Sequence, residues 1–167
     1  MTAIAALALL ASPRMAHALP VEIVTELGDA RLLGASRYQV LAWQVFDAEL
    51  WSRGAHFSWD EPFALSLVYH RNFEADVLVS RSLSGMAERS SLASRESLAV
   101  RLRPCFADVR AGDRFTGVSL TPDTARFYFN GRRTCDVSWP GFRRAFFGIW
   151  LDARGADRAF SARLVGR

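Results

Sequence analysis

Two arginines and a tyrosine stand where neighbouring strands could bring them to one end of a sheet. Arg37 begins a long, mostly apolar segment, and Arg71 ends a shorter strand-like segment beside Tyr69. If the two segments share a sheet, both guanidinium groups can approach one end of the space between the sheet and the helices that cover it. A guanidinium binds a carboxylate through paired hydrogen bonds, and a buried arginine requires an acid or a bound anion. The two arginines therefore need either an internal acid or a bound anion, and our hypothesis is that a carboxylate ligand binds them.

Structural roles are the alternative for these residues, because Tyr69 could be a half-buried strand residue and Arg71 could pair with Glu74. Asp47 and Glu49 are two residues apart on one strand face, as a glycosidase acid pair could be, but two solvated carboxylates are the simpler explanation. No histidine or cysteine pair has metal-ligand spacing, and there is no Gly-rich phosphate loop or nucleophile elbow. We therefore predict no catalytic residue, metal or cofactor.

Cys105 and Cys135 are the two cysteines of the chain. In an oxidising compartment such a pair can form a disulfide, which is worth roughly 3 kcal/mol in the chain-entropy description. The alternative is a pair of small buried side chains that never meet. The sequence leaves both alternatives open.

The positive charge is spread along the chain. All 21 residues of the Lys and Arg class are arginine, and the formal net charge is +4. Nucleic-acid binding needs a concentrated basic face that displaces counterions from phosphates, and the arginines form no such cluster. We exclude nucleic acid as a partner, while the oligomeric state stays open.

The N-terminal residues have the pattern of an export signal. Ala3–Ala11 is an apolar run too short to span a bilayer, and Ala16-His17-Ala18 has the small-x-small pattern that signal peptidase cleaves. The basic residue that usually precedes such a run is absent. We predict a signal peptide over residues 1–18 and a single domain over 19–167. The protein would be periplasmic or secreted, with no integral membrane segment after signal removal.

Strand periodicity recurs along the predicted domain. The strands that we predict are Val21–Glu26, Arg37–Trp51, Phe63–Tyr69, Asp113–Leu120, Arg126–Phe129 and Arg132–Val137. The alternation of the second one slips near Gln44, which a bulge or a strand covered on both faces would explain. The last three form a meander, and Asn130-Gly131 predicts a type I′ turn within it.

Helical periodicity marks the remaining segments. We predict helices from Ala75 to Met86, from Leu98 to Val109 with a break at Pro104, and from about Ala156 through Leu164. In Phe142–Leu151, an apolar stripe would bury Phe146 and Trp150 against the sheet, and Arg143 and Arg144 would point away. Antiparallel strands with grouped helices predict an α+β fold, an antiparallel sheet with helices packed on one face.

The order of a helix, a meander and a Phe-Gly-Ile-Trp-Leu helix resembles the bacterial chalcone isomerase-like proteins. The likeness covers roughly residues 28–166, including Leu33–Arg37, Val45–Trp51, Leu65–Arg71 and Phe106–Phe115. It implies the open-faced sandwich of chalcone isomerase, whereas fold by itself does not determine an activity.

The resemblance also implies roles for particular positions. Plant chalcone isomerases close a flavanone ring with an Arg, a Thr, a Tyr and an Asn in a cleft. Arg37 matches that Arg and Asn72 lies near the Asn, but Phe46 and Phe73 stand at the Thr and Tyr positions and can donate no hydrogen bond.

Related non-catalytic proteins of the superfamily bind a fatty acid in the same cleft, with an Arg and a Tyr near the carboxylate. Arg37, Tyr69 and Arg71 would do that work here. We therefore expect an exported, non-catalytic chalcone isomerase-like protein that binds a small apolar carboxylate such as a fatty acid. The alternatives are an isomerase (intramolecular lyase) with a rewired cleft and an interaction module without a ligand.

Overall fold

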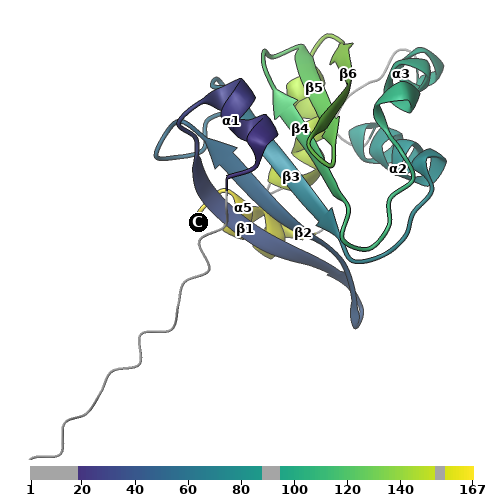
Figure 1. The fold of residues 1–167 in the computed structure, drawn as a ribbon, viewed down its shortest axis with the longest axis horizontal. Helices are drawn as coiled ribbons and strands as arrows, with labels where there is room; N and C mark the ends of the chain where they lie inside the picture. Colours follow the sequence, from purple (N-terminus) through teal and green to yellow (C-terminus); the bar gives the residue numbers. More distant parts are fainter. Residues whose placement is uncertain (1–18, 88–94, 153–156) are drawn as a thin grey trace, which may run out of the picture.

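Six antiparallel strands in chain order form one sheet in the computed structural model, which describes residues 19–87, 95–152 and 157–167 (Figure 1). The strands are β1 (Arg31–Val40), β2 (Trp43–Ser52), β3 (Phe63–Tyr69), β4 (Arg114–Ser119), β5 (Thr124–Phe129) and β6 (Arg132–Ser138). The helices are α1 (Val21–Leu27), α2 (Ala75–Ala87), α3 (Arg95–Leu102), α4 (Gly148–Leu151) and α5 (Arg158–Leu164). Among the described residues, no helix is long and apolar enough to cross a bilayer.

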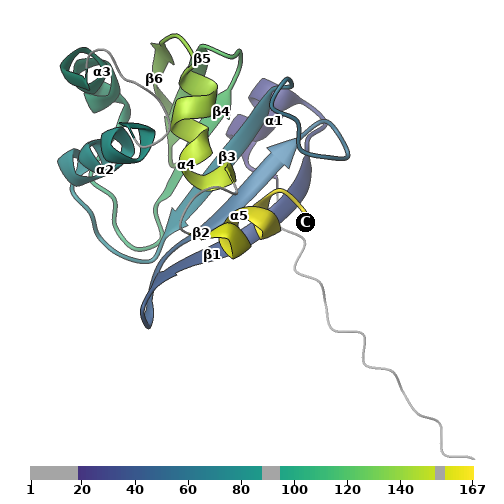
Figure 2. The same ribbon diagram turned by 180° about the vertical axis from the view of Figure 1, so that it is seen from behind.

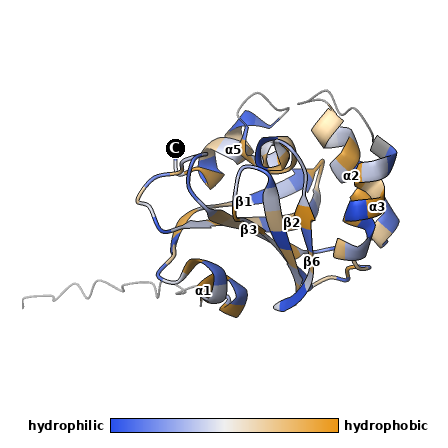
Figure 3. Cartoon of the chain, turned by 90° about the horizontal axis from the view of Figure 1, so that it is seen from above, coloured by the Kyte–Doolittle hydropathy of each residue, from blue (hydrophilic) through white to orange (hydrophobic). Residues whose placement is uncertain are grey.

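The helices α2, α3, α4 and α5 lie on one face of the sheet, and the large core lies between them and the sheet (Figure 2). We call this the inner face. The predicted α+β class and the packing of grouped helices on one face are confirmed. The short helix α1 lies on the opposite, outer face, as the view along the sheet shows (Figure 3).

The predicted strand Val21–Glu26 is wrong, because these residues form α1. Ile23 and Leu27, one helical turn apart, are buried against the outer-face residues Trp51 and Val118. Burial of one helix face outweighs the weak strand preference of β-branched residues. A hydrogen-bonded ion pair also fixes the helix: the buried Glu22 accepts from Nε of Arg114 at 2.9 Å.

The predicted single strand Arg37–Trp51 is a hairpin that reverses at Leu41-Ala42, between β1 and β2. Neither residue is a usual turn former, and Leu41 adopts φ 55°, so the sequence carried no turn signal here. The predicted bulge is present: Phe46 pairs with Tyr38 and Gln44 with Gln39, which leaves Val45 as the extra residue. The bulge and the turn together explain the slip in alternation.

Other local predictions are confirmed. The strand Phe63–Tyr69 has the predicted bounds, and Asn130 and Gly131 both have positive φ, at 49° and 79°, as a type I′ turn requires. The helix α3 ends at Leu102, two residues before Pro104, and a 3₁₀ turn follows it. The predicted continuation of this helix to Val109 is wrong, because Val109 forms a bridge with Phe73 instead.

The helix predicted over Phe142–Leu151 consists of a π-helical segment, Arg143–Phe147, and then α4. Because a π-helix has more residues per turn, side chains rotate relative to an α-helical stripe. Arg143, the first residue of this segment, is buried, not solvated, and donates from Nε to Oγ of Ser119 and from Nη1 to the carbonyl of Trp59, both at 2.6 Å. Arg144 remains exposed, as predicted. Phe146 is buried as predicted, whereas Trp150 is half-buried.

Candidate functional site

A cavity of about 680 Å³ lies between the inner face of the sheet and the helices. Phe46, Leu67 and Phe115, on three adjacent strands, contribute to its floor, and side chains of α2, the π-helical segment, α4 and α5 contribute to its wall. Most of the lining side chains are apolar or aromatic. The cavity can therefore exclude water around an apolar ligand.

Aromatic residues form a row at one end of the cavity. Tyr38, Phe46 and Tyr69 lie opposite one another across β1, β2 and β3. The rings of Tyr38 and Phe46 stack at 5.0 Å, and Tyr69 makes edge contacts at 5.9 Å with both Phe46 and Phe73. The row brings two hydroxyl groups to the cavity on a rigid apolar support.

Some polar side chains of the lining are already paired. The Ser82 hydroxyl donates to the carbonyl of Leu78 at 2.9 Å, and the Ser161 hydroxyl donates to the carbonyl of Trp150 at 2.7 Å. The Asp157 carboxylate accepts from the backbone N–H of Phe160 at 2.8 Å and caps α5. These groups serve the helices that carry them.

Three other polar groups have no hydrogen-bond or ion-pair partner within the described part of the chain: the hydroxyls of Tyr38 and Tyr69 and the guanidinium of Arg81. Burial raises the pKa of the Tyr69 hydroxyl, which therefore stays protonated and can donate a hydrogen bond. Arg81, on α2, is exposed to solvent while lining the cavity. Together these groups offer two neutral donors and one cation to a ligand.

The exposed residues of the lining locate the mouth of the cavity. Val40 near the tip of the β1–β2 hairpin is 50% exposed, and Val77 on α2 is 42% exposed. Arg81 and Asp157 are exposed as well. The mouth therefore lies between the hairpin, the first half of α2 and the start of α5.

Arg37 does not reach this cavity. Side chains alternate along a strand, and because Tyr38 faces the cavity, Arg37 faces the outer side of the sheet. There Nε of Arg37 donates to Oδ1 of Asp47 at 2.6 Å, and His70 Nε2 lies 2.9 Å from Oδ2 of the same carboxylate. The hydrogen bonds from Arg37 hold the pKa of Asp47 below its ordinary value. Arg37 is thus satisfied by an internal acid.

Tyr69 and Arg71 are also separated, because only Tyr69 belongs to the cavity lining. Arg71 is exposed, and its guanidinium carbon lies 4.1 Å from the ring centroid of Trp43 instead of pairing with Glu74. Sequence reasoning missed Arg81. Its spacing of three residues from Leu78, which belongs to the apolar stripe of α2, was the available signal, since such neighbours share a helix face.

Two of the four positions that the isomerase comparison singled out are apolar here. Phe46 and Phe73 both line the cavity, so neither supplies the hydroxyl donor of the plant enzymes. Oδ1 of Asn72 accepts from the backbone N–H of Ala111 at 3.1 Å. Within the described ranges, no three His, Cys, Asp or Glu side chains are grouped to hold a metal ion.

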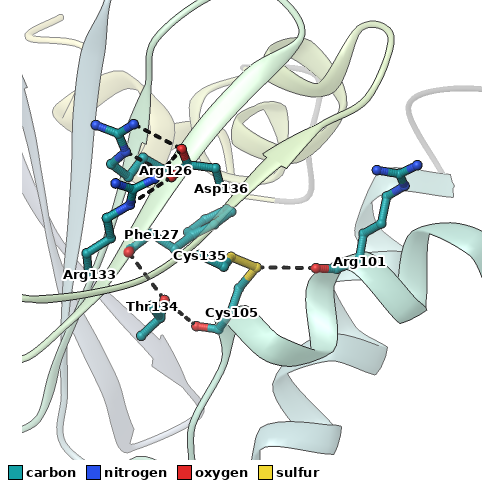
Figure 4. Close-up of a disulfide and its surroundings, with 8 residues drawn as sticks. All are labelled: Arg101, Cys105, Arg126, Phe127, Arg133, Thr134, Cys135 and Asp136. Carbon is teal, nitrogen blue, oxygen red and sulfur yellow. Dashed lines mark hydrogen bonds and ion pairs between the residues drawn. A yellow bond between two sulfur atoms is a disulfide. The ribbon is translucent and has the colours of Figure 1, made fainter.

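Cys105 and Cys135 form a disulfide, with their Cα atoms 5.0 Å apart (Figure 4). The bond joins the 3₁₀ turn after α3 to β6, and the Thr134 hydroxyl lies 2.9 Å from the carbonyl oxygen of Cys105. Phe106, the next residue, lines the cavity. The disulfide therefore anchors one wall of the cavity.

Comparisons with known proteins agree with this architecture. A crystal structure of a fatty-acid binding protein from Arabidopsis thaliana matches with a TM-score of 0.66 and 10% sequence identity, over 84% of this chain and 89% of that one. At this identity the match shows the fold alone. A search of curated protein sequences finds no significant match. A family model described as chalcone isomerase-like matches residues 55–166, which is more than half of the chain. The protein therefore belongs to the chalcone isomerase-like family, as the motifs of its sequence suggested.

Proposed function

We propose that this protein is a non-catalytic carrier of a small apolar carboxylate, such as a fatty acid, which it binds in the cavity between the sheet and the helices. The observation that carries the proposal is an apolar cavity of about 680 Å³ with an arginine at its mouth. Ligand sites typically have volumes of about 300–1,000 Å³, so the volume of this cavity is suitable for a small ligand such as a fatty acid.

The apolar wall accounts for the tail of such a ligand. Each methylene group that leaves water contributes roughly 0.8 kcal/mol, and the aromatic floor and roof offer contact to many of them. The Arabidopsis protein with the same fold is a fatty-acid binding protein, which supports this choice of tail.

The polar groups account for the head. Arg81 can donate two hydrogen bonds to a carboxylate, and its position at the mouth keeps the charged head close to water. The Tyr38 and Tyr69 hydroxyls are neutral donors deeper in the aromatic row. In this proposal Arg81 takes the role that the sequence suggested for Arg37 and Arg71.

Replacing Arg81 by Ala is expected to weaken fatty-acid binding roughly tenfold, equivalent to about 1.4 kcal/mol, because the carboxylate loses its cation. Titration of the purified protein with a fluorescent fatty acid measures the dissociation constant. Arg37→Ala is the matched control, since it removes an arginine on the opposite face and should leave the affinity unchanged. The wild type should also prefer a fatty acid to the alcohol of equal length, and Arg81→Ala should lose that preference.

Equal affinities of the wild type and Arg81→Ala would reject the carboxylate assignment. A wild-type protein that shows no saturable binding of acid or alcohol would reject the carrier function itself. Native mass spectrometry of the protein as purified adds an independent observation, because a tightly held lipid should appear as a discrete mass increment.

We infer further that the protein is exported. The segment Ala3–Ala11 and the Ala16-His17-Ala18 motif lie outside the described residues. The described residues support export indirectly, in two ways. A disulfide persists in oxidising compartments, and Leu19, the first residue after the motif, packs against the outer-face core under α1. A chain that is cleaved after Ala18 would therefore begin with the first residue of the folded domain.

N-terminal sequencing of the protein from its native host is expected to begin at Leu19. Fractionation of the same cells should place the protein outside the cytoplasm. An intact Met1 on protein from the cytoplasmic fraction would contradict the export proposal, whereas the proposed ligand site would stand unaffected.

A further inference from the structure

Exposed apolar side chains gather around the mouth of the cavity. Eight large hydrophobic residues are exposed among those that the structure describes, and two of them, Val40 and Val77, line the cavity at its mouth. Two more lie next to Val40 in the hairpin: Leu41 follows it in the turn, and Trp43 is paired with it across β1 and β2. We call these four residues the rim. Isolated apolar residues on a surface are ordinary, but a group that continues the lining of an apolar cavity marks an interaction surface.

The hairpin tip is the most prominent part of the rim. Leu41 is 91% exposed and Trp43 is 58% exposed, and Figures 1 and 2 show the β1–β2 hairpin extending beyond the rest of the domain. Leu41 also has a positive φ of 55°, where Asn or Gly would form the turn at lower energy. A bulky apolar residue at such a position opposes both solvation and turn stability, which indicates a functional reason for it.

Side chains of both charges lie beside the rim, and an arginine packs directly against its tryptophan. Arg71 packs over Trp43, and Arg81 lies at the mouth; neither has an ion-pair partner in the part of the chain that the structure describes. The acids of this region are Asp76, which pairs with Arg103 at 2.7 Å, Asp157, which caps α5, and the exposed Glu74. An indole with a guanidinium above it suits the boundary between acyl chains and phosphates of a bilayer.

We propose that the rim docks on the surface of a lipid bilayer that carries anionic headgroups, with Leu41 and Trp43 inserted among the lipids and Arg71 against the phosphates. A narrow projecting tip suits insertion into lipid, whereas a stable dimer needs a broad complementary face of about 800 Å² per partner. The docked mouth faces the membrane, so a ligand can pass between the bilayer and the cavity. This passage rests on the proposed carrier function, but docking is measurable without a ligand.

The test is flotation of the purified protein with vesicles of phosphatidylcholine, with and without phosphatidylglycerol. The wild type should bind the anionic vesicles, and Leu41→Asn should weaken binding roughly tenfold by removing the inserted side chain. Asn accepts a positive φ, so this variant should unfold at the same temperature as the wild type or higher. Val100→Asn, at a 74% exposed site on α3, is the matched control and should bind like the wild type.

Arg71→Gln should reduce the binding to anionic vesicles and the dependence of binding on salt. Equal binding by the wild type and Leu41→Asn, or equal loss in Val100→Asn, would overturn the proposal. The proposal would also be overturned if the wild type binds no vesicles and forms a dimer in solution that Leu41→Asn dissociates. The rim would then bind a second copy of the chain.

Fatty-acid titration without vesicles separates this proposal from the carrier function. Leu41→Asn should bind the fluorescent fatty acid as the wild type does, because Leu41 does not line the cavity. Vesicle binding by a protein that takes up no fatty acid would refute the carrier function and leave docking in place. Fatty-acid binding by a protein that does not bind vesicles would refute docking and leave the carrier function in place.

Discussion

Replacing Phe127 by Ala is expected to lower the free energy of unfolding by about 3–5 kcal/mol, the range for truncation of a large buried aromatic residue. Phe127 on β5 is fully buried, and its ring lies 5.2 Å from that of Phe146 and 5.5 Å from that of Phe115. Phe106 and Phe142 also contact it. The side chain therefore joins the sheet, the π-helical segment and the cavity wall, and its loss leaves a void that several rings border.

Urea denaturation of the purified protein measures this change. Trp150→Ala is the informative comparison, because the sequence predicted that Trp150 is buried against the sheet together with Phe146. Trp150 is half-buried and borders a cavity, so its truncation removes fewer contacts and should destabilise the protein less than Phe127→Ala does. A larger loss in Trp150→Ala than in Phe127→Ala would show that the core is centred elsewhere.

Removing the disulfide, by Cys105→Ala together with Cys135→Ala, is expected to lower the free energy of unfolding by about 3–4 kcal/mol. The two cysteines are 30 residues apart in sequence, and the bond restricts the unfolded chain over that whole loop. The loop contains β4 and β5, so its closure also limits how far the 3₁₀ turn can separate from β6.

Reduced wild-type protein provides the control, because it has lost the bond and kept both sulfur atoms. It should unfold at nearly the same urea concentration as the double variant, and both should unfold earlier than the oxidised wild type. If oxidised and reduced wild type unfold together, the bond does not constrain the unfolded state. If only the double variant is destabilised, packing of the buried Cys105 is responsible.

The local sequence pattern was sufficient to predict those strands, turns and helix ends that depend only on the residues within them. Phe63–Tyr69 alternates cleanly because neighbouring side chains on a strand face opposite sides of the sheet, and Asn130-Gly131 tolerates the positive φ values that its turn requires. Pro104 cannot continue a helix, and α3 ends before it. These signals, with the ordered motifs, determined the α+β class and the family.

The candidate site depended on which faces meet, and that is a tertiary property. The sequence correctly places Arg37 on a strand, but it does not show which face of the sheet the side chain occupies. Because side chains alternate, Tyr38 faces the cavity and Arg37 faces Asp47 on the other side. The spacing of Arg81 from Leu78 indicated its helix face, but only the placement of α2 shows that this face borders the cavity. The helix α1 and the burial of Arg143 are likewise decided by packing, which outweighs the weak local preferences of those residues. The reversal at the exposed residues Leu41 and Ala42 follows from the pairing of β1 with β2.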